Sequence, residues 1–280
     1  MIRRGDEFVL NRIDTTFARL RTAGRAALIP YIAAGDPAPE LTVPIMHALA
    51  AAGADVIELG VPFSDPMADG PVIQRASERS LAHGVGLSAV LEMVATFRKS
   101  DPSTPIVLMG YANPIEAMGC ARFAERAQAA GVDGVIVVDY PPEEAREFAT
   151  LLVERHLSPI FLLSPTTPID RMKAIGSAAR GYVYYVSLKG VTGAGHIDIA
   201  DVIAHLAEIR SHIALPIGVG FGIRDAASAK AIAAHADAIV IGSKLIEQIE
   251  MGAADGAAAR ARDWLATIRA AIDAVAKRAA

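Results

Sequence analysis

The first residue that could do chemistry is Glu58, near the end of the short apolar segment 55–59. If this segment is a strand, Val56 and Glu58 share one face, and Ile57 and Leu59 share the other. A carboxylate among apolar side chains is costly unless it is paired or used. Apolar surroundings also raise its pKa, which suits a group that both gives and takes a proton. Glu58 is therefore a candidate general acid–base, with a buried structural salt bridge as the alternative.

The segment that follows, residues 61–71, offers two further acids, Asp65 and Asp69, among three prolines. Proline restricts the backbone and lowers the entropy that is lost when a loop is ordered. Such a loop can hold a side chain over an opening beside Glu58. An Asp before Pro or Gly is also a common turn former. The position directly after Glu58 favours a functional role for at least one of the two.

Three glycine-bearing segments, 190–195, 220–223 and 242–244, could bind an anion. Glycine lets backbone N–H groups approach a ligand closely. The last segment opens into a predicted helix near Ser243, whose N-terminal end adds its dipole. Each segment alone could be a tight turn without a ligand. Their position after three consecutive predicted strands favours a phosphate-bearing ligand.

The scaffold for these residues is predicted from an alternation of short apolar segments and longer helical ones. Continuous apolar strands such as 135–138 are typical of parallel strands buried on both faces. Eight strand–helix units predict an α/β fold, a (β/α)8 TIM barrel, and a doubly wound open sheet is the alternative. Functional residues of such barrels lie at the C-terminal ends of the strands. We expect strands at 27–33, 55–59, 106–110, 134–138, 159–163, 182–187, 216–219 and 238–241.

Helical segments are expected between and after these strands, and one precedes the first. They include residues 13–23, 40–52, 120–130, 143–155, 199–211, 226–234 and 257–278. No linker interrupts the pattern. We therefore expect a single TIM-barrel domain over residues 1–280, in which residues 1–24 form a helical extension packed on the barrel.

Composition excludes several other classes of protein. Hydrophobic residues make up 52% and charged residues 21% of the 280 residues, which is enough for a packed core and a solvated surface. A net charge of -4 argues against nucleic-acid binding. The sequence starts without a secretory signal and has no apolar run of about 18 residues, so we expect a cytoplasmic protein without a membrane span. The single cysteine, Cys120, is expected to be structural, and the seven histidines lack zinc-site spacing, so no metal is expected.

Several segments carry a resemblance to a known family. Residues 30–37 (PYIAAGDP), 58–74 (ELGVPFSDPMADGPVIQ), 109–114 (MGYANP), 190–193 (GVTG) and 220–223 (GFGI) resemble the tryptophan synthase alpha-subunit family. The likeness covers nearly the whole chain, and segment 58–71 is highly specific. It implies a lyase of tryptophan biosynthesis that splits indole-3-glycerol phosphate into indole and glyceraldehyde 3-phosphate by a retro-aldol reaction, without a cofactor.

The resemblance also implies residue roles. The general acid–base glutamate falls on Glu58, and the aspartate that faces the indole N–H falls on Asp69. A supporting catalytic tyrosine falls on Tyr184, with Tyr182 and Tyr185 as alternatives of register. The remaining substrate-binding positions are Thr192, which is implied to orient the acids, Gly193, Gly222, Gly242 and Ser243 at the phosphate, and Tyr31, Ile73, Met109, Val138 and Phe221 around the indole.

A partner is implied as well. The resemblance predicts a complex of two alpha and two beta subunits, with contacts near Asp65 and the segment from Tyr111 to Pro114. One departure from the family is Tyr31, where many members have phenylalanine. Three alternatives remain open: another phosphate-binding barrel isomerase or epimerase, a subunit that mainly activates its partner, and an indole-releasing lyase that works alone. The first does not explain segment 61–71.

Overall fold

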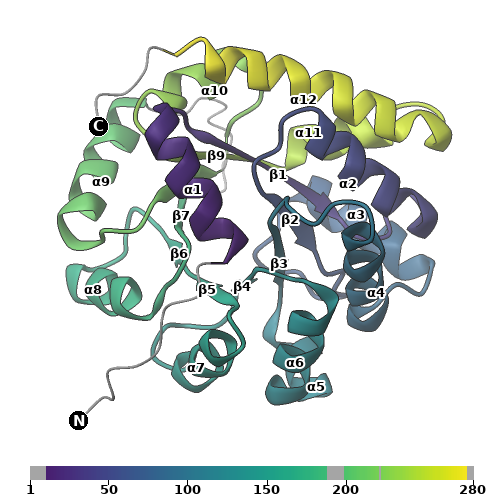
Figure 1. Cartoon of the computed structure of the whole chain (residues 1–280), viewed down its shortest axis with the longest axis horizontal. Coiled ribbons are helices and arrows are strands. Elements are labelled where there is room, and N and C mark those ends of the chain that lie inside the picture. Colours follow the sequence, from purple (N-terminus) through teal and green to yellow (C-terminus); the bar gives the residue numbers. More distant parts are fainter. Residues whose placement is uncertain (1–10, 188–198, 221, 276–280) are drawn as a thin grey trace.

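The computed structural model describes residues 11–187, 199–220 and 222–275 (Figure 1). Within these ranges the chain forms nine strands, all paired in parallel. The strands are β1 (Ala27–Ala33), β2 (Ile57–Gly60), β3 (Ile106–Gly110), β4 (Gly134–Val137), β5 (Ser158–Ile160), β6 (Leu162–Leu163), β7 (Val183–Val186), β8 (Ile217–Gly220) and β9 (Ala238–Ile241).

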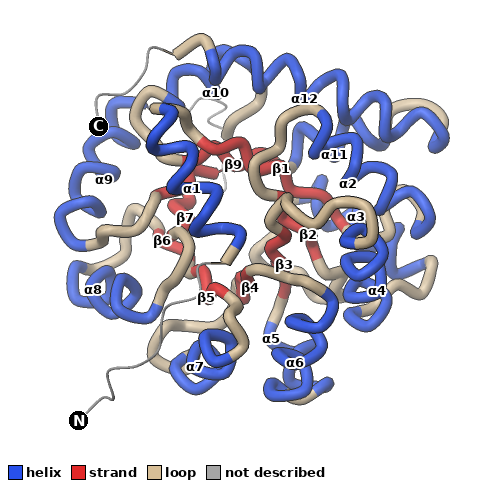
Figure 2. Tube along the Cα trace, viewed as in Figure 1, coloured by secondary structure: helices blue, strands red, loops and turns tan. Residues whose placement is uncertain are grey.

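Helices follow the strands and surround them (Figure 2). The α-helices are α1 (Arg12–Ala23), α2 (Thr42–Ala51), α3 (Pro71–Ala82), α4 (Leu87–Arg98), α5 (Ala112–Met118), α6 (Cys120–Ala130), α7 (Arg146–Glu154), α8 (Ile169–Ala178), α9 (Ile199–His212), α10 (Ala226–Ala233), α11 (Ser243–Glu250) and α12 (Ala257–Asp273). Two short 3-10 helices are η1 (Pro39–Leu41) and η2 (Ala254–Gly256).

The strands form a nearly closed barrel in the order β5-β4-β3-β2-β1-β9-β8-β7-β6. The two ends of this order, β5 and β6, are separated in the chain only by Phe161. The ring therefore has eight positions, and the predicted TIM barrel is confirmed (Figure 2). The assignment of residues 1–280 to one domain stays a prediction.

Some predicted boundaries were wrong. The strand expected at 159–163 is divided into β5 and β6, because its hydrogen-bond partner changes from β4 to β7. Its side chains still alternate through the change, with Ile160 inside the barrel and Phe161 outside. The second strand begins at Ile57 and ends at Gly60, and the helix expected at 40–52 is divided into η1 and α2.

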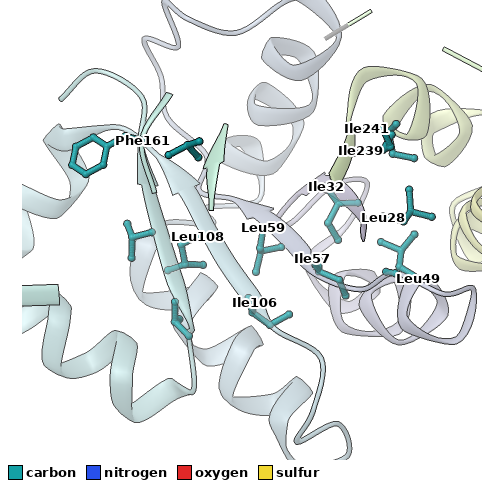
Figure 3. Packing of buried hydrophobic residues seen from close by; sticks show 14 of the residues in the cluster. Leu28, Ile32, Leu49, Ile57, Leu59, Ile106, Leu108, Phe161, Ile239 and Ile241 are labelled. Atoms are coloured by element: carbon teal, nitrogen blue, oxygen red, sulfur yellow. The ribbon is translucent and has the colours of Figure 1, made fainter. Parts of the chain in front are cut away.

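Two hydrophobic layers hold the barrel together. Outward-facing residues such as Ile57 and Leu59 pack against the surrounding helices (Figure 3). Inward-facing residues such as Val56 fill the interior, as the predicted alternation requires. Helix α1 crosses one end of the ring in Figure 1, and its Ile13 and Phe17 pack with the interior side chains. This helix closes the end of the barrel opposite to the C-terminal strand ends.

The register between β1 and β2 fixes the position of Glu58. Tyr31 is paired with Glu58 in the ladder. Three residues earlier in each segment, the backbone N–H of Leu28 on β1 donates to Asp55 Oδ2, two residues before β2, at 3.0 Å. The guanidinium of Arg269, on α12, also donates to this oxygen at 2.9 Å. The Asp55 side chain therefore ties the chain just before β2 to β1 in the same register that pairs Tyr31 with Glu58.

No single helix in the described part of the chain is long and apolar enough to cross a membrane. Only α3 and α4 taken together meet the length and hydropathy that a span requires, and the two helices are bent by 94° at the break between them. Each has a face of buried residues.

Candidate active site

Glu58 lies inside the barrel on β2, with a side chain that has no exposed surface. Its Oε1 accepts a 2.6 Å hydrogen bond from the Tyr182 hydroxyl, and its Oε2 has no partner among the described residues. Burial raises the pKa of Glu58 to about 8, against the opposing effect of the Tyr182 hydrogen bond. Glu58 therefore holds a proton at neutral pH and has one oxygen free to exchange it with a ligand.

The three tyrosines near β7 separate according to the face on which they lie. Tyr182, just before β7, and Tyr184 both pack in the interior cluster, whereas Tyr185 faces the outer layer and stacks on His205 of α9. Tyr182 is the one that hydrogen bonds to Glu58. The ring of Tyr184 lies over Gly220 of β8, where a β-carbon would overlap its hydroxyl. The catalytic role of Tyr184 stays a prediction, and Tyr182 joins the site on geometry.

Asp69 lies in the loop 61–70 between β2 and α3, half-buried beside Tyr111. The Tyr111 hydroxyl donates to Asp69 Oδ2 at 3.1 Å and accepts from the backbone N–H of Ala68 at 3.0 Å. The side chain of Gln74 donates to the Asp69 carbonyl at 2.8 Å. Burial raises the pKa of Asp69 to about 6, and the Tyr111 hydrogen bond opposes this rise. Asp69 is therefore held in place and remains largely ionised at neutral pH.

The other predicted acid of this loop, Asp65, is exposed and accepts a 2.5 Å hydrogen bond from the Ser64 hydroxyl. Its neighbour Met67 has 85% of its surface exposed. Of the two aspartates, only Asp69 is turned into the protein. Asp65 thus belongs to an outer surface and lies apart from the interior carboxyl group.

Two of the predicted phosphate positions are at the start of α11. Helix α11 begins at Ser243, as expected, and its N-cap residue is Gly242, which has no side chain to cap the first N–H groups. Gly222, after β8, has a φ of 78°, a left-handed conformation that favours glycine. The first N–H groups of α11 can therefore donate hydrogen bonds to an anion. The predicted ligands Thr192 and Gly193 lie outside the described residues.

The side chain of Lys244 does not supply a free cation to this position. Its ammonium group forms a 2.7 Å ion pair with Glu247 on the same helix. Asp225 caps α10 through a hydrogen bond from the Ser228 N–H at 2.8 Å, so it too has a structural task. What the described residues offer to an anion at the start of α11 is therefore backbone N–H groups and the dipole of the helix.

Apolar side chains predicted to surround the ring of the ligand are grouped at the same end of the barrel. Tyr31, Ile73 and Met109 belong to one cluster with Ile246 of α11. Val138, directly after β4, packs at the edge of the interior cluster. Phe221 lies outside the described residues. Of the described members of this set, Tyr31, Ile73 and Met109 thus contact the cluster that includes α11, and Val138 lies with the interior side chains.

Sequence reasoning missed two close contacts, each between a glycine on one strand and a tyrosine ring from the next strand. Gly60 and Gly220 were not assigned a role beside the tyrosines, yet β-carbons at these positions would overlap the hydroxyls of Tyr31 and Tyr184. Glycine is needed at both because a phenol ring crosses each strand closely. An inward-facing glycine next to a strand that carries an inward-facing tyrosine is the signal that could have found them.

The fold and this arrangement are typical of one class of protein, a phosphate-binding barrel enzyme with an acid–base carboxyl group at the C-terminal ends of its strands. A family model described as "Tryptophan synthase alpha chain" matches residues 17–276. The chain therefore belongs to the tryptophan synthase alpha chain family. The predicted activity, a lyase of tryptophan biosynthesis, is confirmed at the level of this family.

Individual relatives agree with this membership. The chain is 66% identical over 272 residues to the tryptophan synthase alpha chain of Bordetella pertussis, covering 94% of this chain and 95% of that one. It is 61% identical to the alpha chain of Laribacter hongkongensis, covering 95% and 100%. A solved structure of tryptophan synthase subunit alpha from Legionella pneumophila has a TM-score of 0.88 and 44% identity, covering 95% of this chain and 100% of that one.

Proposed function

We propose that this chain cleaves indole-3-glycerol phosphate to indole and glyceraldehyde 3-phosphate, with Glu58 as the group that moves the proton. The protonated Glu58 carboxyl donates its proton to C3 of the indole ring. The resulting carboxylate then takes the proton of the glyceryl hydroxyl next to the bond that breaks. As that C–C bond breaks, its electrons return to the ring and the hydroxyl carbon becomes the aldehyde. Glu58 ends in the protonated state in which it began.

Asp69 has the complementary task of stabilising charge. Protonation at C3 places positive charge near the indole N–H, and an ionised carboxylate facing that group lowers the energy of the charged species. Glu58 and Asp69 suit this division because their pKa values are about 8 and about 6. Between these values Glu58 holds its proton while Asp69 is charged, which is the required combination of states.

The phosphate is proposed to bind the backbone N–H groups at the start of α11, around Gly242 and Ser243. Gly222 and Gly193 are proposed as further contacts, and Thr192 as a residue that orients the acids. Tyr31, Ile73, Met109, Val138 and Phe221 are proposed to enclose the indole ring, with Tyr184 as a supporting catalytic residue. No metal or organic cofactor takes part in this scheme.

The observation that carries the proposal is the state of Glu58: wholly buried on the inner face of β2, protonated at neutral pH and with Oε2 unpartnered among the described residues. A buried carboxyl group of this kind is costly to the fold and is explained by its chemistry. The test is indole release from indole-3-glycerol phosphate by the purified chain, alone and with a beta subunit. No indole under either condition contradicts the proposal, and so does turnover of sugar phosphates in its place.

We further propose that the chain works in the cytoplasm in a complex of two alpha and two beta subunits. The proposed contact surface combines loop 61–70 with the start of α5, between Tyr111 and Pro114. These two segments are in contact, because the ring of Phe63 stacks on that of Tyr111 with centroids 5.1 Å apart. The exposed Met67 supports a contact at this surface. A chain that purifies and sediments with a beta subunit as a complex of four chains supports this arrangement, and a one-to-one dimer contradicts it.

A further inference from the structure

The hydroxyl group of Tyr31 has an unusual position. Tyr31 lies on β1 with 7% of its surface exposed, and its ring lies between two glycines. On one side, a β-carbon at Gly242 would contact the ring at 3.4 Å. On the other side, a β-carbon at Gly60 would overlap the hydroxyl oxygen and lie 2.6 Å from Cζ. The ring therefore extends from the start of α11 to the end of β2 and carries its hydroxyl to the strand that holds Glu58.

This hydroxyl makes no hydrogen bond within the part of the chain that the structure describes. The charged and titratable groups that influence it electrostatically are Asp69, Glu58, Tyr111 and Asp36, with Asp69 first. Burial and these carboxylates raise the pKa of the Tyr31 phenol well above its ordinary value. The hydroxyl therefore keeps its proton and can donate a hydrogen bond. It stays protonated at every pH at which the protein works.

Two of the three neighbouring carboxyl groups already have strong partners. Asp36 accepts hydrogen bonds from two nitrogens of the Arg79 guanidinium, Nε at 2.6 Å and Nη2 at 3.0 Å. Glu58 accepts the hydrogen bond from Tyr182 at Oε1, and its Oε2 is also unpartnered among the described residues, but its pKa of about 8 keeps it protonated at neutral pH and makes it a weaker acceptor than a carboxylate. Asp69 accepts one hydrogen bond, at Oδ2, and its Oδ1 has no partner in the described ranges. With a pKa of about 6, Asp69 is therefore the ionised acceptor with room for a second donor.

Packing places the segments that carry Asp69 and Tyr31 beside each other. Helix α3 starts at Pro71, directly after the loop that carries Asp69, and its Ile73 packs in one cluster with Tyr31. The hydroxyl of Tyr111 holds Asp69 from the end of β3. Gly60, which the Tyr31 hydroxyl covers, is the ladder partner of Met109 on β3. Strand β1 thus contacts helix α3 through Tyr31 and Ile73, and the residue directly after β3, Tyr111, binds Asp69 just before α3.

We propose that Tyr31 is a positioning residue for Asp69, whose hydroxyl donates to the free carboxylate oxygen in the ligand-bound enzyme and keeps that carboxylate ionised and facing the indole N–H. The idea rests on the proposed function. A second donor favours the charged form of a carboxyl group and lowers its pKa. Three phenol groups lie within the electrostatic reach of Asp69: Tyr111, which donates to it, and Tyr31 and Tyr184, whose pKa values its charge raises.

The test compares Tyr31→Phe with Tyr185→Phe in the full chain with its beta subunit. Both changes remove one buried hydroxyl and keep the ring, but the unpartnered Tyr185 hydroxyl lies on the outer side of the barrel. The pH dependence of kcat for indole release is measured for each, because kcat reports the ionisations of the ligand-bound enzyme. In Tyr31→Phe the acid limb of kcat shifts up by about 0.5–1 pH unit, and kcat falls about 1.5-fold to threefold at pH 6.5 with a small change in KM. Tyr185→Phe leaves the profile of the wild type.

An acid limb that is unchanged in Tyr31→Phe overturns the proposal, and a rise in KM alone also overturns it, because the hydroxyl then contacts the substrate and not Asp69. Thermal unfolding of both variants separates these outcomes from a folding defect. Wild-type protein is assayed first. Absence of indole release there contradicts the proposed function, whereas an active wild type with an unchanged Tyr31→Phe profile contradicts only the role of Tyr31.

Discussion

The hydroxyl of Tyr182 donates a 2.6 Å hydrogen bond to Oε1 of Glu58 from the opposite wall of the barrel. Tyr182 is itself held by Phe17 of α1, with ring centroids 5.7 Å apart. The helix that closes one end of the barrel therefore supports the phenol that orients the carboxyl group. One carboxyl oxygen is fixed, and the other faces the place where a ligand must arrive.

Tyr182→Phe is expected to move the alkaline limb of the pH profile upward. The hydrogen bond from Tyr182 lowers the pKa of Glu58, so its removal raises that pKa further above about 8. We expect a shift of about 0.5–1 pH unit in the alkaline limb of kcat/KM and a loss of roughly tenfold in kcat, because Glu58 is less well oriented and gives up its proton less readily. An alkaline limb that stays in place or moves downward contradicts this assignment.

The wild-type enzyme is expected to show a bell-shaped dependence of kcat/KM on pH. Activity requires ionised Asp69, which is lost as the pH falls through about 6, and protonated Glu58, which is lost as the pH rises through about 8. The plateau lies between these two values. A profile that rises through pH 9, or one that is maximal at pH 5, is incompatible with these roles.

Glu58→Gln is expected to stabilise the fold at alkaline pH. The pKa of Glu58 is raised from 4.5 to about 8, so the folded state binds this proton more tightly than the unfolded chain does. Because ionisation of Glu58 is harder in the folded state, it lowers the free energy of unfolding as the pH rises. This loss of stability is absent below pH 4.5 and complete above about pH 8. Urea unfolding should show a gain of roughly 2–4 kcal/mol at pH 8.5 and little difference at pH 5. Equal gains at the two pH values would show that charge is not the cause.

The sequence predicts most of this architecture because parallel-barrel strands leave a strong pattern. The ends of β1, β3 and β9 match their predicted ranges, and the alternation in β2 places Glu58 on the inner face. Asp69 could be selected only through the family resemblance. Alternation alone does not distinguish it from Asp65, because both lie in an irregular loop and only tertiary contact with Tyr111 separates them.

The choice between Tyr182 and Tyr184 could not be made from the sequence for a different reason. Both residues have the same parity and face the interior, so alternation allows either to reach Glu58. The stagger between strands on opposite sides of the barrel decides which hydroxyl is level with the carboxyl group. That offset depends on the closure of the whole ring, and no local segment encodes it.

Met67→Asp is expected to weaken binding of the beta subunit at least about tenfold, because it places a charge where an apolar side chain is proposed to be buried. Met67 is 85% exposed in the free chain, so the variant should fold normally. Met251→Asp is the matched control, since this methionine is 57% exposed in the loop after α11. Affinity is measured by titration of labelled beta subunit. Equal affinities for the two variants would place the interface elsewhere.

The buried Glu58 carboxyl group is proposed to carry the proton in the lyase reaction. The most direct measurement is single-turnover indole release by Glu58→Gln, together with the affinity of the variant for glyceraldehyde 3-phosphate. We predict that indole release falls by about 10²–10⁴-fold, while the affinity for the phosphate product stays within about twofold, because that ligand is proposed to bind at the start of α11. Release of indole within about tenfold of the wild-type rate, with the phosphate affinity intact, would contradict the claim.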